Sequence, residues 1–172
     1  AIQGPKAEAL MASIFGDKIK EIKFFNFKFF DFLGSKQLIA RSGYSKQGGF
    51  EVYLNGFNLG SKLWEVIWDA GKKFNITAGC PNLIERIEGG LLSYGNEFTI
   101  QNNPFECNFD KFLSTDSDHT YIGKNSLEKI KNEGVKKRIK GILFDSVPCP
   151  PCAKPFPVLS KKGAKIGQIT SG

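Results

Sequence analysis

The stretch Arg41-Ser-Gly-Tyr-Ser-Lys-Gln-Gly-Gly-Phe-Glu-Val-Tyr-Leu54 decides how the first half of the chain folds. Residues 42–49 are too rich in glycine and small polar side chains for regular structure, so they predict a loop. Residues 50–54 alternate between the two faces expected of a strand. A glycine loop that leads directly into a strand is therefore the centre of the predicted fold.

The segments on either side of this stretch have alternating strand and helix patterns. Strand-like segments are rich in aromatic or β-branched residues, and helical segments repeat apolar residues at helical spacing. The strand-like segments are Ile22–Phe32 and Gln37–Arg41, and the helical segments are Pro5–Phe15, Ser61–Phe74 and Asn82–Glu88. This mixture predicts an α+β domain.

The last third of the chain has a different pattern. A polar segment rich in Asp and Ser, residues 114–120, is the best candidate for a linker. After it, Arg138–Phe144 and Ala164–Thr170 are strand-like and are separated by a proline-rich stretch, as in a small β module. We therefore predict a first domain over residues 1–113 and a second over residues 121–172.

Composition excludes several classes of protein. The 172 residues are 41% hydrophobic and 24% charged, as in soluble globular proteins. No apolar run approaches the roughly 18 residues that cross a bilayer, and no secretion signal is visible, so we expect a cytoplasmic protein without a membrane partner. His119 is the single histidine, which excludes a histidine-based triad or a multi-histidine metal site within the chain. The lone Cys149–Cys152 pair lacks a second pair for zinc, so no metal is expected.

The net charge of +7 is concentrated in the last 52 residues. Residues 121–172 hold 11 Lys or Arg against three acidic side chains. This concentration of basic residues has three interpretations: a solvated basic surface, a site that attracts a small polyanion, or a nucleic-acid-binding module. The segment has few aromatic residues on which bases could stack, namely Tyr121, Phe144 and Phe156, which argues against nucleic acid.

Several motifs occur together in one order along the chain. The segments Arg41–Tyr53 and Glu85-Arg-Ile-Glu-Gly-Gly-Leu-Leu-Ser-Tyr-Gly-Asn96 resemble the folate-dependent aminomethyltransferase family, typified by the T-protein of the glycine cleavage system. Shorter matches fall at Ile2-Gln-Gly-Pro5, Asn103-Pro-Phe-Glu106, Ile122-Gly-Lys124 and Lys165–Gly172. Within the family, Ala78–Glu88 and the loop at residues 42–49 are most similar to members that demethylate dimethylsulfoniopropionate.

The resemblance implies a fold, a cofactor and a reaction. The implied fold is part of an aminomethyltransferase-type domain followed by the start of a small C-terminal β-barrel. The implied cofactor is tetrahydrofolate, which would accept a methyl group at N5 from a sulfonium donor. Aminomethyl transfer from a lipoyl carrier, as in T-proteins, is the alternative. A small-molecule donor is thus the expected partner, and a homodimer stays open as the state of association.

The resemblance also implies that the chain is part of a longer enzyme. Full members carry a catalytic aspartate in a preceding segment, so no catalytic residue is expected within these residues. Their C-terminal barrel continues beyond the point where this sequence stops. On this basis we expect the isolated chain to bind folate poorly and to turn over little substrate.

Three side chains match or suggest binding positions. Glu51 matches the family carboxylate that accepts the paired N–H groups of the pterin ring, an arrangement suited to a bidentate acceptor. Tyr44 matches a family tyrosine that contacts folate. Tyr53 shares a strand face with Glu51, and its aromatic ring is our candidate for the side of the site that holds the donor cation. From the residues alone, a Glu51 that points to solvent is the favoured interpretation, which the resemblance reverses, and Tyr44 as a cover for the core stays the alternative.

Overall fold

The computed structural model describes residues 1–79, 83–143, 145, 147, 152 and 154–172. These residues form two compact units, Ala1–Gly89 and Gly90–Gly172. Helices and strands both occur in each unit, which confirms the predicted α+β class.

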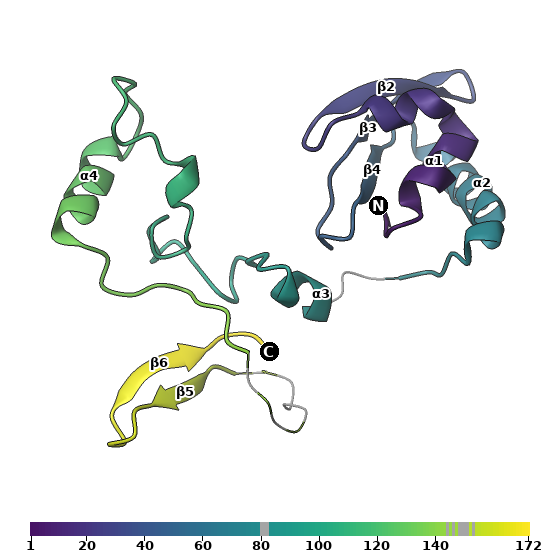
Figure 1. The fold of residues 1–172 in the computed structure, drawn as a ribbon. Coiled ribbons are helices and arrows are strands. Elements are labelled where there is room, and N and C mark those ends of the chain that lie inside the picture. Colours follow the sequence, from purple (N-terminus) through teal and green to yellow (C-terminus); the bar gives the residue numbers. More distant parts are fainter. Residues whose placement is uncertain (80–82, 144, 146, 148–151, 153) are drawn as a thin grey trace. The chain divides into compact units, whose positions relative to one another are not determined.

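The first unit is built on a four-stranded antiparallel sheet (Figure 1). Its strands are β1 Ile2–Gln3, β2 Phe27–Phe32, β3 Ser35–Ala40 and β4 Gly49–Tyr53, in the order β1-β4-β3-β2. Leu33 and Gly34 join β2 to β3 with φ angles of 52° and 78°. Positive φ at both central residues is the geometry of a tight two-residue hairpin turn, and it fixes the β2–β3 register.

The helices of the first unit agree with the sequence pattern. They are α1 Ala7–Phe15, α2 Gly60–Gly71 and α3 Leu83–Glu88, with short 3₁₀ turns η1 Asp17–Glu21, η2 Phe57–Leu59 and η3 Lys72–Phe74. As predicted, α1 ends at Phe15, and the next residue, Gly16, has a φ of 80°. Helices α1 and α2 lie together on one side of the sheet (Figure 1).

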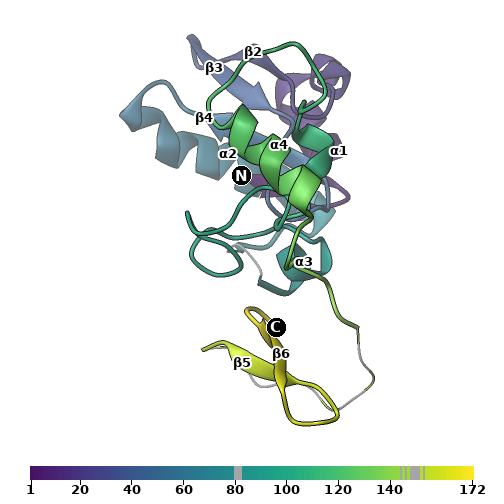
Figure 2. The same cartoon turned by 90° about the vertical axis from the view of Figure 1, so that its left-hand side faces the viewer.

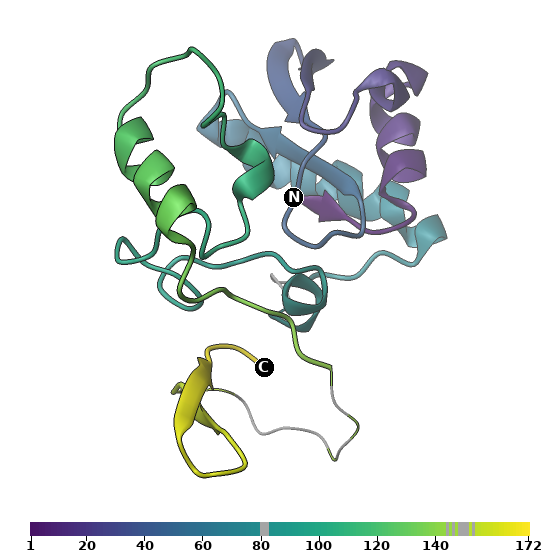
Figure 3. The same cartoon turned by 60° about the vertical axis from the view of Figure 1, so that its left-hand side comes forward.

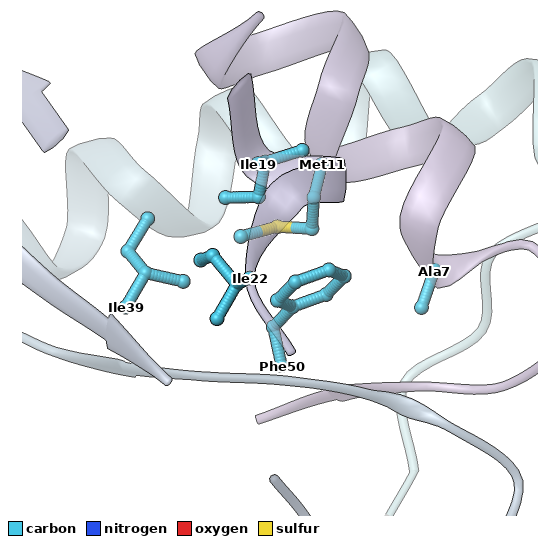
Figure 4. Close-up of a cluster of buried hydrophobic side chains, with 6 residues drawn as sticks. All are labelled: Ala7, Met11, Ile19, Ile22, Ile39 and Phe50. Atoms are coloured by element: carbon cyan, nitrogen blue, oxygen red, sulfur yellow. The ribbon is translucent and has the colours of Figure 1, made fainter. Parts of the chain in front are cut away.

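A hydrophobic cluster joins α1 and η1 to the sheet (Figure 4). Met11 of α1 and Ile19 of η1 point toward Ile39 of β3 and Phe50 of β4, and all four are fully buried. Ala7 and Ile22 complete the cluster. Because Phe50 directly precedes Glu51, this core fixes the strand that carries Glu51, the expected folate contact.

The strand predicted over Ile22–Phe32 is shorter in the structure and begins at Phe27. Ile22 is instead buried in the helical layer, at 2% exposure. A turn follows, in which the Asn26 N–H donates to the Lys23 carbonyl at 2.9 Å and Phe25 has a φ of 59°. The sequence did not predict this turn, because the aromatic segment contains neither glycine nor proline.

The second unit has sparse regular structure. Its elements are η4 Asp110–Phe112, α4 Lys124–Glu133, β5 Phe156–Leu159 and β6 Lys165–Ile169. Helix α4 is the green helix of Figure 2, and β5 pairs with β6 in an antiparallel hairpin, coloured yellow. The hairpin turn is closed by the Ser160 N–H, which donates to the Ala164 carbonyl at 2.8 Å.

Two predictions for the C-terminal region need correction. Residues 138–143 are not a strand, while Phe144 lies outside the described residues. The Ile139 N–H donates instead to the Glu106 carbonyl at 2.8 Å, and Arg138 binds Asp110, so the segment is held against residues 105–110. The partner of β6 is β5, from the stretch that we assigned to a proline-rich excursion. A two-stranded hairpin does not confirm a barrel.

The division at residues 113 and 114 stays a prediction. Residues 114–120, the predicted linker, belong to the second compact unit and contain a turn in which Ser117 donates to the Ser114 carbonyl. In the part of the chain that the structure describes, no helix is both long and apolar enough to cross a membrane.

Candidate functional site

The four-stranded sheet has one face covered by helices and one face that the helices of its own unit leave open. Phe50 and Val52 of β4 point toward the helices, on the covered face. Glu51 and Tyr53 alternate with them, so they point to the open face. The strand register confirms that Glu51 and Tyr53 share a face, as the sequence predicted.

Aromatic side chains from β2 extend this open face. Phe27 pairs with Ala40, which pairs with Glu51, and paired residues of antiparallel strands point to the same side. In the next row, Phe29 pairs with Leu38, which in turn pairs with Tyr53. The three aromatic rings of these rows are 55–60% exposed.

The structure thus divides the phenylalanine side chains of β2 between the two faces of the sheet. Phe30 and Phe32 pack against Phe15 on the helical side, with ring centroids 5.9 and 6.2 Å apart. Phe27 and Phe29 contact each other edge to face at 5.9 Å on the open side. The sequence did not distinguish these two sets, because the turn at residues 23–26 sets the phase of the strand.

Glu51 is half-buried and is held by a neighbour that the sequence analysis did not single out. The hydroxyl of Ser42 donates a hydrogen bond to Oε2 of Glu51. Ser42 is the first residue of the glycine loop, and Tyr44 follows two residues later, 42% exposed. The signal for Ser42 was its place in the Arg41-Ser-Gly-Tyr44 motif, where a small hydroxyl precedes the glycine.

Two side chains of the glycine loop form hydrogen bonds with helix α3 or the residue that follows it. Lys46 donates to the Gly89 carbonyl at the end of α3 at 3.1 Å, and Gln47 donates to Glu85 at 3.2 Å. A shallow cleft of about 410 Å³ lies between the loop and α3. Glu85 and Glu88 line this cleft together with Lys46, so its charges are mixed.

The residue directly before this loop is the positively charged Arg41. Arg41 pairs with Glu8 of α1 at 2.5 Å, and its guanidinium lies over the Phe50 ring, 5.1 Å from the centroid. This ion pair connects the end of β3 to α1 on the helical side of the sheet. Glu51 points to the opposite, open face. Among the described residues, no group of three or more His, Cys, Asp or Glu side chains could hold a metal ion.

Comparison with known proteins assigns the chain to a family. The profile of the GCVT N-terminal domain matches residues 1–117. The chain belongs to this family. It is 44% identical over 171 residues to dimethylsulfoniopropionate demethylase DmdA of Ruegeria pomeroyi, and 36% identical over 176 residues to an aminomethyltransferase of Natranaerobius thermophilus. The family recognised in the motifs is therefore confirmed.

The matches cover nearly all of this chain but only part of the relatives. They include 99% of the chain in the comparison with the demethylase and all of it in the comparison with the aminomethyltransferase. The same matches cover 46% and 47% of those two relatives. The chain thus spans about half the length of the relatives it matches.

Proposed function

We propose that the protein containing this chain is a tetrahydrofolate-dependent methyltransferase that demethylates dimethylsulfoniopropionate. The similarity to the demethylase of Ruegeria pomeroyi supports this choice of donor. The observation that carries the proposal is the placement of Glu51, half-buried on the open sheet face and bound by Ser42 at the start of the family's glycine loop. A cytoplasmic location, a small-molecule donor and the absence of a nucleic-acid partner belong to the same proposal.

In this proposal Glu51 binds the pterin ring. A carboxylate has about four acceptor sites on its two oxygens, so the Ser42 hydroxyl leaves room for two further donors. The ring N–H and the exocyclic amino group of the pterin offer two donors side by side, and a charged acceptor makes both hydrogen bonds stronger. Tyr44, from the same loop, supplies an aromatic body with a polar tip for a half-apolar ligand.

The donor is a sulfonium cation, and the open face offers aromatic rings for it. Tyr53 lies two residues beyond Glu51 on the same face, so its ring is our candidate contact for the cation. In the transfer, the sulfur–methyl bond breaks and its electron pair stays on sulfur, which leaves as a neutral thioether. The N5 lone pair forms the new bond to the methyl group, and the N5 proton passes to solvent. Positioning of the two reactants supplies most of the rate for such a transfer.

Aminomethyl transfer is the second candidate, because the relative from Natranaerobius thermophilus is an aminomethyltransferase. The two candidates differ in their folate product. The full-length protein would be given tetrahydrofolate with either dimethylsulfoniopropionate or an aminomethyl-lipoyl carrier, and the folate product would be identified by mass spectrometry. We expect 5-methyl-tetrahydrofolate from the first donor, whereas methylene-tetrahydrofolate from the second donor alone would replace our proposal with the alternative.

A further inference from the structure

Gln3 lies in the Ile2-Gln-Gly-Pro motif, for which the proposed function gives no role. Its side chain contacts the glycine loop at two places. Nε2 donates to the Ser42 carbonyl at 3.1 Å, and Oε1 accepts from the Ser45 hydroxyl at 2.8 Å. One amide group thus holds both sides of the segment that carries Tyr44.

The backbone reinforces this connection. The Gly4 N–H donates to the Gly48 carbonyl at 2.8 Å, and Gln3 itself pairs with Gly49 across β1 and β4. The loop between β3 and β4 therefore runs beside the N-terminal strand, marked N in Figure 3. Residues 42–49 are held at their start by the Gln3 side chain and at their end by the β1 backbone.

Gly43 shows how closely the loop fits around this side chain. A Cβ atom built on Gly43 would lie 2.0 Å from Oε1 of Gln3 and 2.3 Å from its Cδ and Nε2. Gly43 has no left-handed φ, so the limit on this position is space rather than backbone conformation. The three nearest atoms all belong to the Gln3 side chain, so a shorter side chain at position 3 would remove these three contacts.

Ser42 links Gln3 to the proposed folate ligand. Its carbonyl accepts from Gln3, while its hydroxyl donates to Glu51. The position of the Ser42 backbone therefore limits where the hydroxyl that binds Glu51 can lie. Loss of the Gln3 amide would free this backbone and let the Ser42–Glu51 pair rotate.

We propose that Gln3 is a positioning residue of the folate site, which orients Glu51 through Ser42 and holds the loop that presents Tyr44. This inference rests on the proposed function. It gives the Ile2-Gln-Gly-Pro motif a role in folate affinity in addition to its role in β1.

The test is a double-mutant cycle in the full-length protein with Gln3→Ala, Gly43→Ala and the double variant. Tetrahydrofolate affinity is measured by titration of the folded protein. We expect each single variant to bind roughly three- to tenfold more weakly, the scale of one or two hydrogen bonds. The double variant should bind no more weakly than Gln3→Ala alone, because the added methyl group occupies the space that the shorter side chain leaves. Two losses that multiply in the double variant would contradict the inference.

Gln37 provides a matched control. It is also a glutamine of this sheet, fully buried, and its Oε1 accepts from the Asn55 N–H at 2.6 Å, away from the glycine loop. Gln37→Ala should lower the melting temperature but leave folate affinity unchanged. If Gln3→Ala behaves in the same way, Gln3 is only structural and the inference is wrong.

A readout without folate separates this inference from the proposed function. Amide hydrogen exchange of residues 42–49 should become faster in Gln3→Ala and stay unchanged in Gln37→Ala. Gln3→Glu retains the shape of the side chain and removes the donor to Ser42, so it repeats the test if Gln3→Ala does not fold. One set of results would refute this inference and leave the proposed function intact. In that case Glu51→Gln binds folate more weakly, while the folded Gln3 variants keep both their folate affinity and their rate of hydrogen exchange in the loop.

Discussion

The two compact units differ in what stabilises them. Among the described residues, the first unit buries nine hydrophobic side chains, whereas the second buries Phe105 and Cys107. The segments of the second unit are instead joined by hydrogen bonds and ion pairs, such as those of Lys131 with Asp116 and of Arg138 with Asp110. Because apolar burial is the main source of folding free energy, we expect the first unit, which carries the proposed site, to be the more stable of the two.

Removal of a core side chain from the first unit should have the largest effect. Phe50 is fully buried between α1 and the sheet, so Phe50→Ala should lower the free energy of unfolding by about 3–5 kcal/mol. Phe112 of the second unit is 70% exposed, and Phe112→Ala should change it by less than about 0.5 kcal/mol. Urea unfolding of both variants measures this difference, and equal losses would show that the two units do not differ in this way.

The second unit offers a thiol as a probe of its small core. Burial, with a smaller contribution from Glu106, raises the pKa of Cys107 above its ordinary value of 9.0. A raised pKa leaves less thiolate at neutral pH, so native Cys107 should react with iodoacetamide more slowly than the partly exposed Cys152. Peptide mass spectrometry follows both sites. Rapid labelling of native Cys107 would show that this core opens readily, and urea should remove the difference.

The ion pairs of the second unit should have smaller, pH-dependent effects. Arg138 donates to both carboxylate oxygens of Asp110 at 2.9 Å, and these hydrogen bonds lower the pKa of Asp110 below its ordinary value of 3.8. A lowered pKa in the folded state means that the pair stabilises the protein above about pH 4 and that this contribution is lost as the pH falls through the folded value. In Arg138→Ala, an NMR titration should find the pKa of Asp110 closer to 3.8.

Asp69 is the matched control for this titration. Its pKa is lowered by Lys72 of the first unit, so it should not respond to Arg138→Ala. An unchanged pKa of Asp110 in the variant would show that Arg138 does not bind it in solution.

The comparison also explains what the sequence could predict. In the first unit, the end of the first helix at Phe15, the helix that begins near Ser61 and the shared face of Glu51 and Tyr53 all follow from local patterns, and all are confirmed. These signals agree with the tertiary structure because one face of each element is buried. The start of β2 was missed, since Ile22, directly after η1, is buried in the core and the chain turns at Phe25 before the strand begins.

The second unit was predicted less well for a physical reason. The apolar residues of 138–143 suggested a strand, but Ile142 and Leu143 are exposed, and the position of this segment is set by Arg138 and by the Ile139 N–H. Such contacts between residues about 30 positions apart leave no periodic signal. In the candidate site, Gln3 was missed for the same reason, because its hydrogen bond to Ser42 joins residues 39 positions apart.

The most direct test of the central claim is the tetrahydrofolate affinity of Glu51→Gln in the full-length protein, measured by titration calorimetry beside the wild type. Glu65→Gln makes the same chemical change on the exposed surface of α2 and serves as control. We predict that Glu51→Gln binds about 10- to 100-fold more weakly, the scale of hydrogen bonds to a charged acceptor, while Glu65→Gln binds as the wild type does. Equal affinity in all three proteins would contradict the assignment of Glu51 as the ligand of the pterin ring.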